Sequence, residues 1–131
     1  MKAVFRRWRE NARVEETRLE AGEITVHVVP GSNQLTVAIA GRTTVDTSPD
    51  LRSVLLGLLR RGTAPLVVID SSALSYIDMS GIATLLEALK AARENSVKLR
   101  LTGMSGQVRS LAEIAQLDTI FNAWGSEVVF C

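Results

Sequence analysis

The sequence has little of several residue types, and each shortage narrows the functions open to the protein. Of 131 residues, one is a cysteine, Cys131, and one is a histidine, His27. No disulfide framework and no zinc-ligand set can be drawn from these two residues. No apolar run approaches the roughly 20 residues that span a bilayer, and residues 1–16 lack the apolar segment of a signal peptide. We therefore expect a cytoplasmic protein without stable membrane insertion, metal or cofactor.

Charge is balanced over the whole chain but is distributed unevenly along it. Fifteen basic residues stand against 14 acidic ones, and the formal net charge of +1 argues against a nucleic-acid partner. Residues 1–22 contain six basic and four acidic side chains. We interpret them as a solvated basic N-terminal extension, although a basic arm for a membrane or nucleic acid stays open, and we assign residues 23–131 to one domain. Deletion of residues 1–21 is predicted to leave the thermal midpoint nearly unchanged, unless Trp8 packs onto the domain.

Alternating and capped segments predict an α/β fold. Residues 24–29 and 34–41 alternate between apolar and polar side chains around the turn PGSN, which predicts a β-hairpin. Helix caps and apolar stripes mark the helices. The predicted strands are 24–29, 34–41, 64–70, 97–103 and 120–124, and the predicted helices are 48–61, 79–94 and 105–117. This order favours a mixed four- to five-stranded sheet with amphipathic helices packed against it.

The stretch SYIDMSGIATLLEALKAAR, residues 75–93, places a carboxylate, a hydroxyl and a glycine where a strand gives way to a helix. Asp78 is a good N-cap for that helix. Gly81 in the first turn costs about 1 kcal/mol relative to alanine, which suggests that something must approach the backbone there. The outer face of the helix is small and nearly uncharged near its start. Such a face suits a docking surface.

Two kinds of chemistry are open to Ser80. As a nucleophile it needs a base, and the only imidazole is His27, on the outer face of the predicted hairpin. Neither a G-x-S-x-G elbow nor a P-loop is present, so we do not expect an enzyme. As a phosphorylation site, Ser80 would place about two negative charges at a helix start, where free N–H groups accept an anion. A partner docked on the neutral face would then be released.

The stretch VVIDSSALSYIDMSGIATLL, residues 67–86, resembles the signature of the STAS domain family, of the anti-sigma factor antagonist type. GRTTVDTSPDLR and LRLTGMSGQVRSLAEIAQLDTIF are similar to the flanking parts, and the resemblance covers about residues 23–124. The serine before the glycine, here Ser80, is the phosphorylated one in the antagonists. Two positions depart from the family pattern. Met79 stands in place of the first serine of a pair, and Thr44 stands in place of an aspartate, with Asp46 nearby.

The resemblance implies a phosphorylation-switched binding module that acts in transcription regulation and signalling. Such an antagonist binds an anti-sigma factor that is also a serine kinase, is released when its serine is phosphorylated, and is reset by a serine phosphatase. The expected partner-binding residues around Ser80 are Asp78, Met79, Gly81, Thr84, Thr43, Thr44 and Asp46. Two alternatives stay open: a STAS subunit of a stressosome or lipid-transport complex without Ser80 phosphorylation, and a small serine-dependent enzyme. Formation of a homodimer also stays open.

Overall fold

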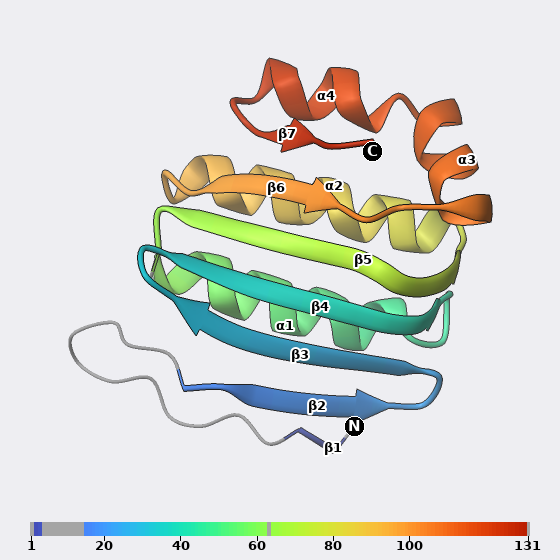
Figure 1. The fold of residues 1–131 in the computed structure, drawn as a ribbon, viewed down its shortest axis with the longest axis horizontal. Helices are drawn as coiled ribbons and strands as arrows, with labels where there is room; N and C mark the ends of the chain where they lie inside the picture. Colours follow the sequence, from blue (N-terminus) through green and yellow to red (C-terminus); the bar gives the residue numbers. More distant parts are fainter. Residues whose placement is uncertain (1, 4–14, 63, 131) are drawn as a thin grey trace.

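The computed structural model describes residues 2–3, 15–62 and 64–130, and in this part the chain forms one mixed sheet (Figure 1). Seven strands follow one another across the sheet in chain order. The first four pair antiparallel, and the last four pair parallel. The strands are β1 (Lys2–Ala3), β2 (Thr17–Ala21), β3 (Ile24–Gly31), β4 (Gln34–Thr43), β5 (Leu66–Ile77), β6 (Lys98–Thr102) and β7 (Glu127–Val128).

Four helices accompany the sheet: α1 (Ser48–Arg61), α2 (Met79–Glu94), α3 (Gly106–Ile114) and α4 (Leu117–Ala123). Figure 1 shows α1 and α2 side by side against one face of the sheet. The alternate apolar side chains of the strands form the core beneath them; they include Val26, Val28, Val37, Ile39, Val67 and Ile69. None of the described helices has the length and apolar character needed to cross a membrane.

The α/β class and the first two helices are confirmed at their predicted bounds. In α1, Pro49 and Asp50 lie in the first turn, and Gly62 ends the helix in the left-handed region at φ 59°. A proline suits the first turn because that position has no intrahelical N–H bond to lose. In α2, Asp78 is the N-cap residue and its side chain accepts a hydrogen bond from Gly81 N–H. Local sequence signals therefore set both helix starts.

Three predicted elements are wrong. The strand count of four to five is too low, because β1 and β2 were not recognised and because β7 forms in residues 127–131, where the sequence left an incomplete helix or a strand open. The predicted helix 105–117 is interrupted after Ile114, since Gln116 adopts a left-handed conformation at φ 57°. Residues 120–124 lie mostly in α4 and do not form a strand: Leu117 and Phe121, four residues apart, are both fully buried, as on one side of a helix.

Strand β2 lies within the segment that we interpreted as a solvated extension. It pairs along its whole length with β3, and Thr17, Leu19 and Ala21 are buried at alternate positions. The sheet thus begins ahead of the predicted boundary at residue 22, and Gly22 and Glu23 form the hairpin turn between β2 and β3. Trp8, on which part of the sequence-based interpretation rested, lies outside the described residues.

Candidate functional site

The candidate site lies where two parallel strands end together. The last residues of β4 and β5, Thr43 and Ile77, are paired in register. The chain continues from Thr43 into the loop 44–47 and from Ile77 into Asp78 and α2. Because crossovers between parallel strands bring such loops to one edge of the sheet, the two sequence-predicted segments meet there. Asp78 N–H donates to the Thr43 carbonyl at 3.1 Å and fixes the base of the loop against α2.

Asp78 connects three parts of this site. Its Oδ1 accepts hydrogen bonds from Ser80 Oγ at 2.5 Å and from Gly81 N–H at 3.1 Å, while its Oδ2 accepts from Val45 N–H at 3.2 Å. Partial burial raises the pKa of Asp78, but the hydrogen bonds from the Ser80 hydroxyl and from the N–H groups of Gly81, Ser80 and Val45 lower it below its ordinary value. The carboxylate is therefore ionised at neutral pH.

Ser80 is half-buried in the first turn of α2, with its hydroxyl donating to Asp78. Its carbonyl accepts a hydrogen bond from Thr84 Oγ1 at 2.9 Å. His27, by contrast, bonds with Glu16 Oε2 at 2.6 Å, where β3 lies beside the start of β2. The Ser–His pair that a serine nucleophile would require is not formed by the described residues.

Other groups lie close to the Gly81 backbone, as the energetic cost of a glycine in a helix suggested. These groups are side chains of this chain and not of a partner. A Cβ at position 81 would lie 2.4 Å from Ile77 Cγ1 and 2.8 Å from Thr43 Cγ2. Both distances are far below van der Waals contact. The glycine therefore allows the start of α2 to pack directly on the ends of β4 and β5, and the interpretation of Gly81 as the point of approach of a partner has a simpler structural explanation.

Replacing Gly81 by alanine is expected to lower the free energy of unfolding by about 1–2 kcal/mol. Overpacking costs about 1–3 kcal/mol, while alanine in a helix gains at most about 1 kcal/mol over glycine. Gly57 in α1 is a matched control, since nothing lies within 4 Å of a Cβ placed there. Gly57→Ala should raise the free energy of unfolding by up to about 1 kcal/mol in the same urea titration. Equal effects of the two substitutions would show that position 81 has room for a methyl group.

The predicted partner-binding residues and their neighbours differ in exposure, and Thr44 and Asp78 are half-buried. Val45 and Met79 are exposed apolar side chains, at 68% and 60% of their full exposure, and Asp46 is exposed beside Val45. Thr43, Gly81 and Thr84 are buried and offer no surface to a partner. We define the docking surface as Thr44, Val45, Asp46, Asp78, Met79 and Ser80. Val45 lies within the loop 43–46 that the sequence assigned to the docking face, although it was not singled out as a binding residue there.

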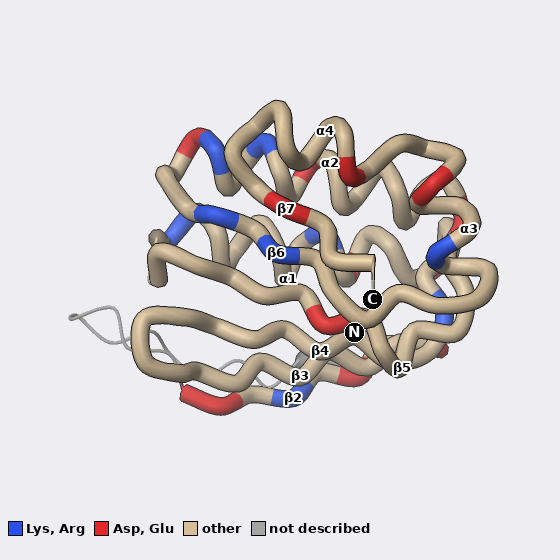
Figure 2. Tube along the Cα trace, turned by 45° about the horizontal axis from the view of Figure 1, so that its top comes forward, with Lys and Arg blue, Asp and Glu red and all other residues tan. Residues whose placement is uncertain are grey.

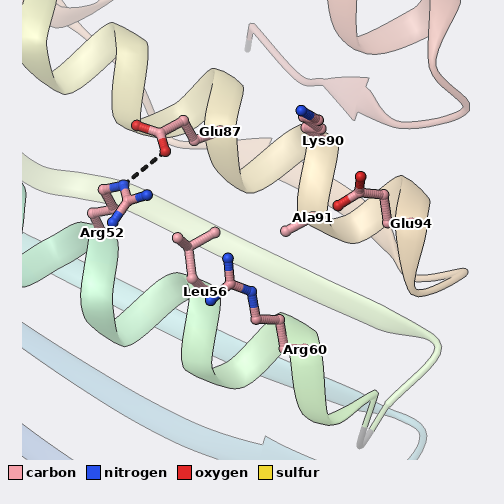
Figure 3. A pocket seen from close by; sticks show the side chains of 7 residues that line it. All are labelled: Arg52, Leu56, Arg60, Glu87, Lys90, Ala91 and Glu94. Atoms are coloured by element: carbon pink, nitrogen blue, oxygen red, sulfur yellow. Dashed lines mark hydrogen bonds and ion pairs between the residues drawn. The ribbon is translucent and has the colours of Figure 1, made fainter.

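The small outer face of α2 that we predicted from the sequence is partly closed. Thr84 and Ala91 are buried, and α1 lies beside α2. Between the two helices a shallow cavity of about 230 Å³ remains (Figure 3). Its floor includes Leu56 and Ala91, and Arg52 Nε bonds with Glu87 Oε2 across it at 2.7 Å. Much of the face that we assigned to a partner is therefore used for packing within the domain.

Gln107 is a positioning residue that the sequence analysis missed. Its amide oxygen accepts from Ile77 N–H at 2.9 Å, and its amide nitrogen donates to the Ile77 carbonyl at 2.7 Å. Strand β6 ends at Thr102, so the far end of β5 has no parallel neighbour on that side. The side chain from α3 takes the place of that neighbour and fixes the residue that precedes Asp78.

Charge and possible metal ligands add no second site. Basic and acidic residues are interspersed over the described chain, without a large region of one sign (Figure 2). Among the described residues no three His, Cys, Asp or Glu side chains are grouped so that they could hold a metal ion.

Comparison with known proteins connects this geometry with a family. A family model described as "Mlab, STAS domain" matches residues 26–122. An anti-sigma-B factor antagonist of Staphylococcus aureus is 31% identical over 93 residues, which cover 70% of this chain and 85% of the relative. A crystal structure of an anti-sigma factor antagonist from Mycobacterium paratuberculosis superposes with a TM-score of 0.68 at 22% identity, covering 79% of this chain and 87% of that one.

The phosphorylated form of SpoIIAA, a Bacillus cell fate determinant, has the same fold, with a TM-score of 0.60 at 12% identity; the match covers 80% of this chain and 91% of that one. The structural similarities show the fold. Family membership follows from the family model, because its match to residues 26–122 covers more than half of the chain. The chain belongs to the STAS domain family.

Proposed function

We propose that this protein is an anti-sigma factor antagonist, a binding module that docks on an anti-sigma factor with serine-kinase activity and is released when Ser80 is phosphorylated. A serine phosphatase would restore the binding form. One observation carries the proposal. The Ser80 hydroxyl lies at the start of α2, next in the chain to the exposed Met79, and it donates to Asp78, the carboxylate that also accepts from the N–H of the exposed Val45.

The unmodified docking surface favours association through its apolar side chains. Met79 and Val45 lose exposed apolar area when a partner covers them, and fully burying such a side chain is worth about 1.5–3 kcal/mol. Ser80 makes its hydrogen bond inside the domain, so a partner need not provide one. A phosphate at this position would place about two negative charges in the interface, beside the ionised Asp78. Desolvation of that charge opposes binding, while the start of the helix accepts the anion.

The relatives support this proposal from two sides. The Staphylococcus aureus relative is named for antagonism of an anti-sigma factor, and a protein of the same fold has been solved in a phosphorylated form. This chain has a serine directly before the glycine, with the N-cap aspartate two residues before that serine.

The proposal is tested by isolating the protein with its partners from its native cells and identifying the partners and the Ser80 peptide by mass spectrometry. We expect an anti-sigma factor with an ATP-binding kinase domain among the partners, and a Ser80 peptide that is heavier by about 80 Da in the unbound pool. Ser80→Ala should retain the partner and lose the heavier peptide. Retention of partners with no kinase domain, and a Ser80 peptide of unmodified mass in both pools, would contradict the proposal.

A second candidate is a STAS subunit of another assembly in which Ser80 is never phosphorylated. It is favoured by the description of the matching family model, which names Mlab and not an antagonist. In that case the docking surface would still bind a protein partner, and its affinity would not depend on a kinase.

A further inference from the structure

The docking surface consists of two segments that are far apart in the sequence. Met79 and Ser80 belong to the start of α2, whereas Thr44, Val45 and Asp46 belong to the loop after β4. The main-chain bond from Asp78 N–H to the Thr43 carbonyl fixes the base of the loop. At the tip, the link to α2 is the bond from Val45 N–H to Asp78 Oδ2, which joins residues 33 positions apart.

The other hydrogen bonds found for the loop among the described residues join its own residues to one another, to β4 or to the start of α1; the Thr47 hydroxyl, for example, donates to the Arg42 carbonyl at 2.8 Å. Thr44 N–H donates to Thr47 Oγ1 at 2.9 Å, and Asp46 N–H donates to Thr44 Oγ1 at 3.2 Å. Thr47 N–H donates to the Thr44 carbonyl at 3.1 Å. These bonds do not involve α2. Of the N–H groups of the loop 44–47, only that of Val45 is bonded to Asp78. The position of the Val45 backbone relative to α2 therefore depends on the Asp78 carboxylate, whereas Thr44 and Asp46 have acceptors within the loop.

We propose that Asp78 is a positioning residue that holds the Val45 backbone at the start of α2, and that a phosphate on Ser80 breaks this link and separates the loop from the helix part of the docking surface. The inference rests on the proposed phosphorylation of Ser80. In that step the Ser80 oxygen forms a bond to the γ-phosphorus of a nucleoside triphosphate, the bond to the diphosphate breaks, and the hydroxyl proton passes to solvent. Asp78 Oδ1 thereby loses its hydroxyl donor and gains an anionic neighbour.

The charges around Asp78 do not offset the phosphate. Its donors are the Ser80 hydroxyl and the N–H groups of Gly81, Ser80 and Val45, all of them neutral. Asp46, at the tip of the loop, adds a further negative charge on the same surface. Arg42, the residue before Thr43, has other partners: its Cζ lies 4.2 Å from the centroid of the Tyr76 ring, and its Nε lies 3.7 Å from Glu23 Oε2. The phosphate therefore repels the Asp78 carboxylate, which accepts from Val45 N–H. The N–H groups at the start of α2 can then donate to the phosphate in place of the carboxylate.

The test measures amide hydrogen exchange in the free, isotopically labelled chain by NMR. The readout is the exchange rate of the Val45 amide divided by that of the Asp46 amide. The phosphate should affect both amides electrostatically to a similar extent, but the Asp46 amide donates to Thr44 Oγ1 within the loop and not to Asp78. Loss of the Asp78 bond should raise this ratio several-fold, up to about tenfold. Four chains are compared: wild type, Ser80→Ala, Asp78→Ser, and a chain in which phosphoserine has been incorporated at position 80.

Asp78→Ser and the phosphoserine chain should both raise the ratio, while Ser80→Ala should leave it within about twofold of the wild-type value. Serine at position 78 retains one capping oxygen for α2, so the helix start should survive the substitution, but it has no second oxygen in place of the Oδ2 that accepts from Val45 N–H. Leu51 N–H, bonded to the Thr47 carbonyl at 3.2 Å, should be unchanged in all four chains.

An unchanged ratio in Asp78→Ser would show that Asp78 does not hold the loop tip. A raised ratio in Asp78→Ser with an unchanged ratio in the phosphoserine chain would show that phosphorylation does not act through this link. Either result overturns the inference. Because no partner is present in the experiment, its outcome is separate from the question of whether the partner is a kinase-type anti-sigma factor.

Discussion

Ser80→Asp is expected to weaken the complex with the anti-sigma factor by about 1–3 kcal/mol, the range for burying an unpaired charged group in a contact that was dry. The physical reason is that Ser80 lies on the docking surface with the exposed apolar side chains Met79 and Val45, and a partner that covers both must exclude water there. Isothermal titration calorimetry with the partner identified by co-purification measures the loss directly. Ser80→Ala, which adds no charge, should bind within a few-fold of the wild type.

A matched charge control is available at the opposite end of the same helix. Ser96 is exposed, follows α2 and lies about 24 Å along the helix axis from the docking surface. Ser96→Asp should bind the partner as the wild type does. The thermal midpoint of Ser80→Asp should change little, because an acidic side chain in the first turn is favoured by the helix dipole, although Asp78 opposes it. Wild-type affinity in Ser80→Asp would leave Ser80 as a neighbour of the helix cap and favour the assembly-subunit candidate.

Deletion of residues 1–21 is expected to lower the free energy of unfolding by at least about 3 kcal/mol, the reverse of the sequence-based prediction. Leu19 is 2% exposed in β2, and burying one leucine side chain is worth about 1.5–3 kcal/mol. Thr17 and Ala21 are buried beside it, and the deletion also removes the five-residue ladder with β3. Urea unfolding followed by circular dichroism measures the difference.

Two variants separate β2 from the residues that precede it. Deletion of residues 1–14 leaves β2 in place and should cost much less than deletion of residues 1–21. Leu19→Ala in the full chain should cost about 2–5 kcal/mol, as for other buried leucines, and remains measurable if the longer deletion does not fold. Equal stabilities of the wild type and the chain lacking residues 1–21 would show that β2 contributes nothing to the fold, despite its burial.

The sequence by itself determined the parts of this protein that local patterns encode. The alternation in residues 24–29 and 34–41 sets the core face of β3 and β4, since successive side chains of a strand point to opposite sides. The starts of α1 and α2 are read from adjacent residues. Pro49 and Asp50 lie in the first turn of α1, although Thr47 makes no side-chain cap bond there, and the Asp78 side chain accepts from Gly81 N–H in α2. The position of Ser80 at a helix start, and the family resemblance built around it, followed from the same short stretch.

The tertiary structure alone decided which residues meet at the site and which are exposed there. Val45 N–H finds its acceptor on Asp78, 33 residues away, and only the pairing of β4 with β5 brings them together. Thr43 and Thr84 were expected on the docking surface, but the packing of α2 on the strand ends and on α1 buries them.

Strand β2 was not predicted from the sequence because its local pattern is weak. Its five residues, TRLEA, combine apolar and charged side chains at alternate positions, a pattern too short to be distinguished from a solvated lead-in. Its identity as a strand depends on the edge of β3, which provides partners for its backbone N–H and C=O groups and a core for Leu19. Short strands and docking surfaces depend on contacts with other segments of the chain, and the composition of a segment does not contain that information.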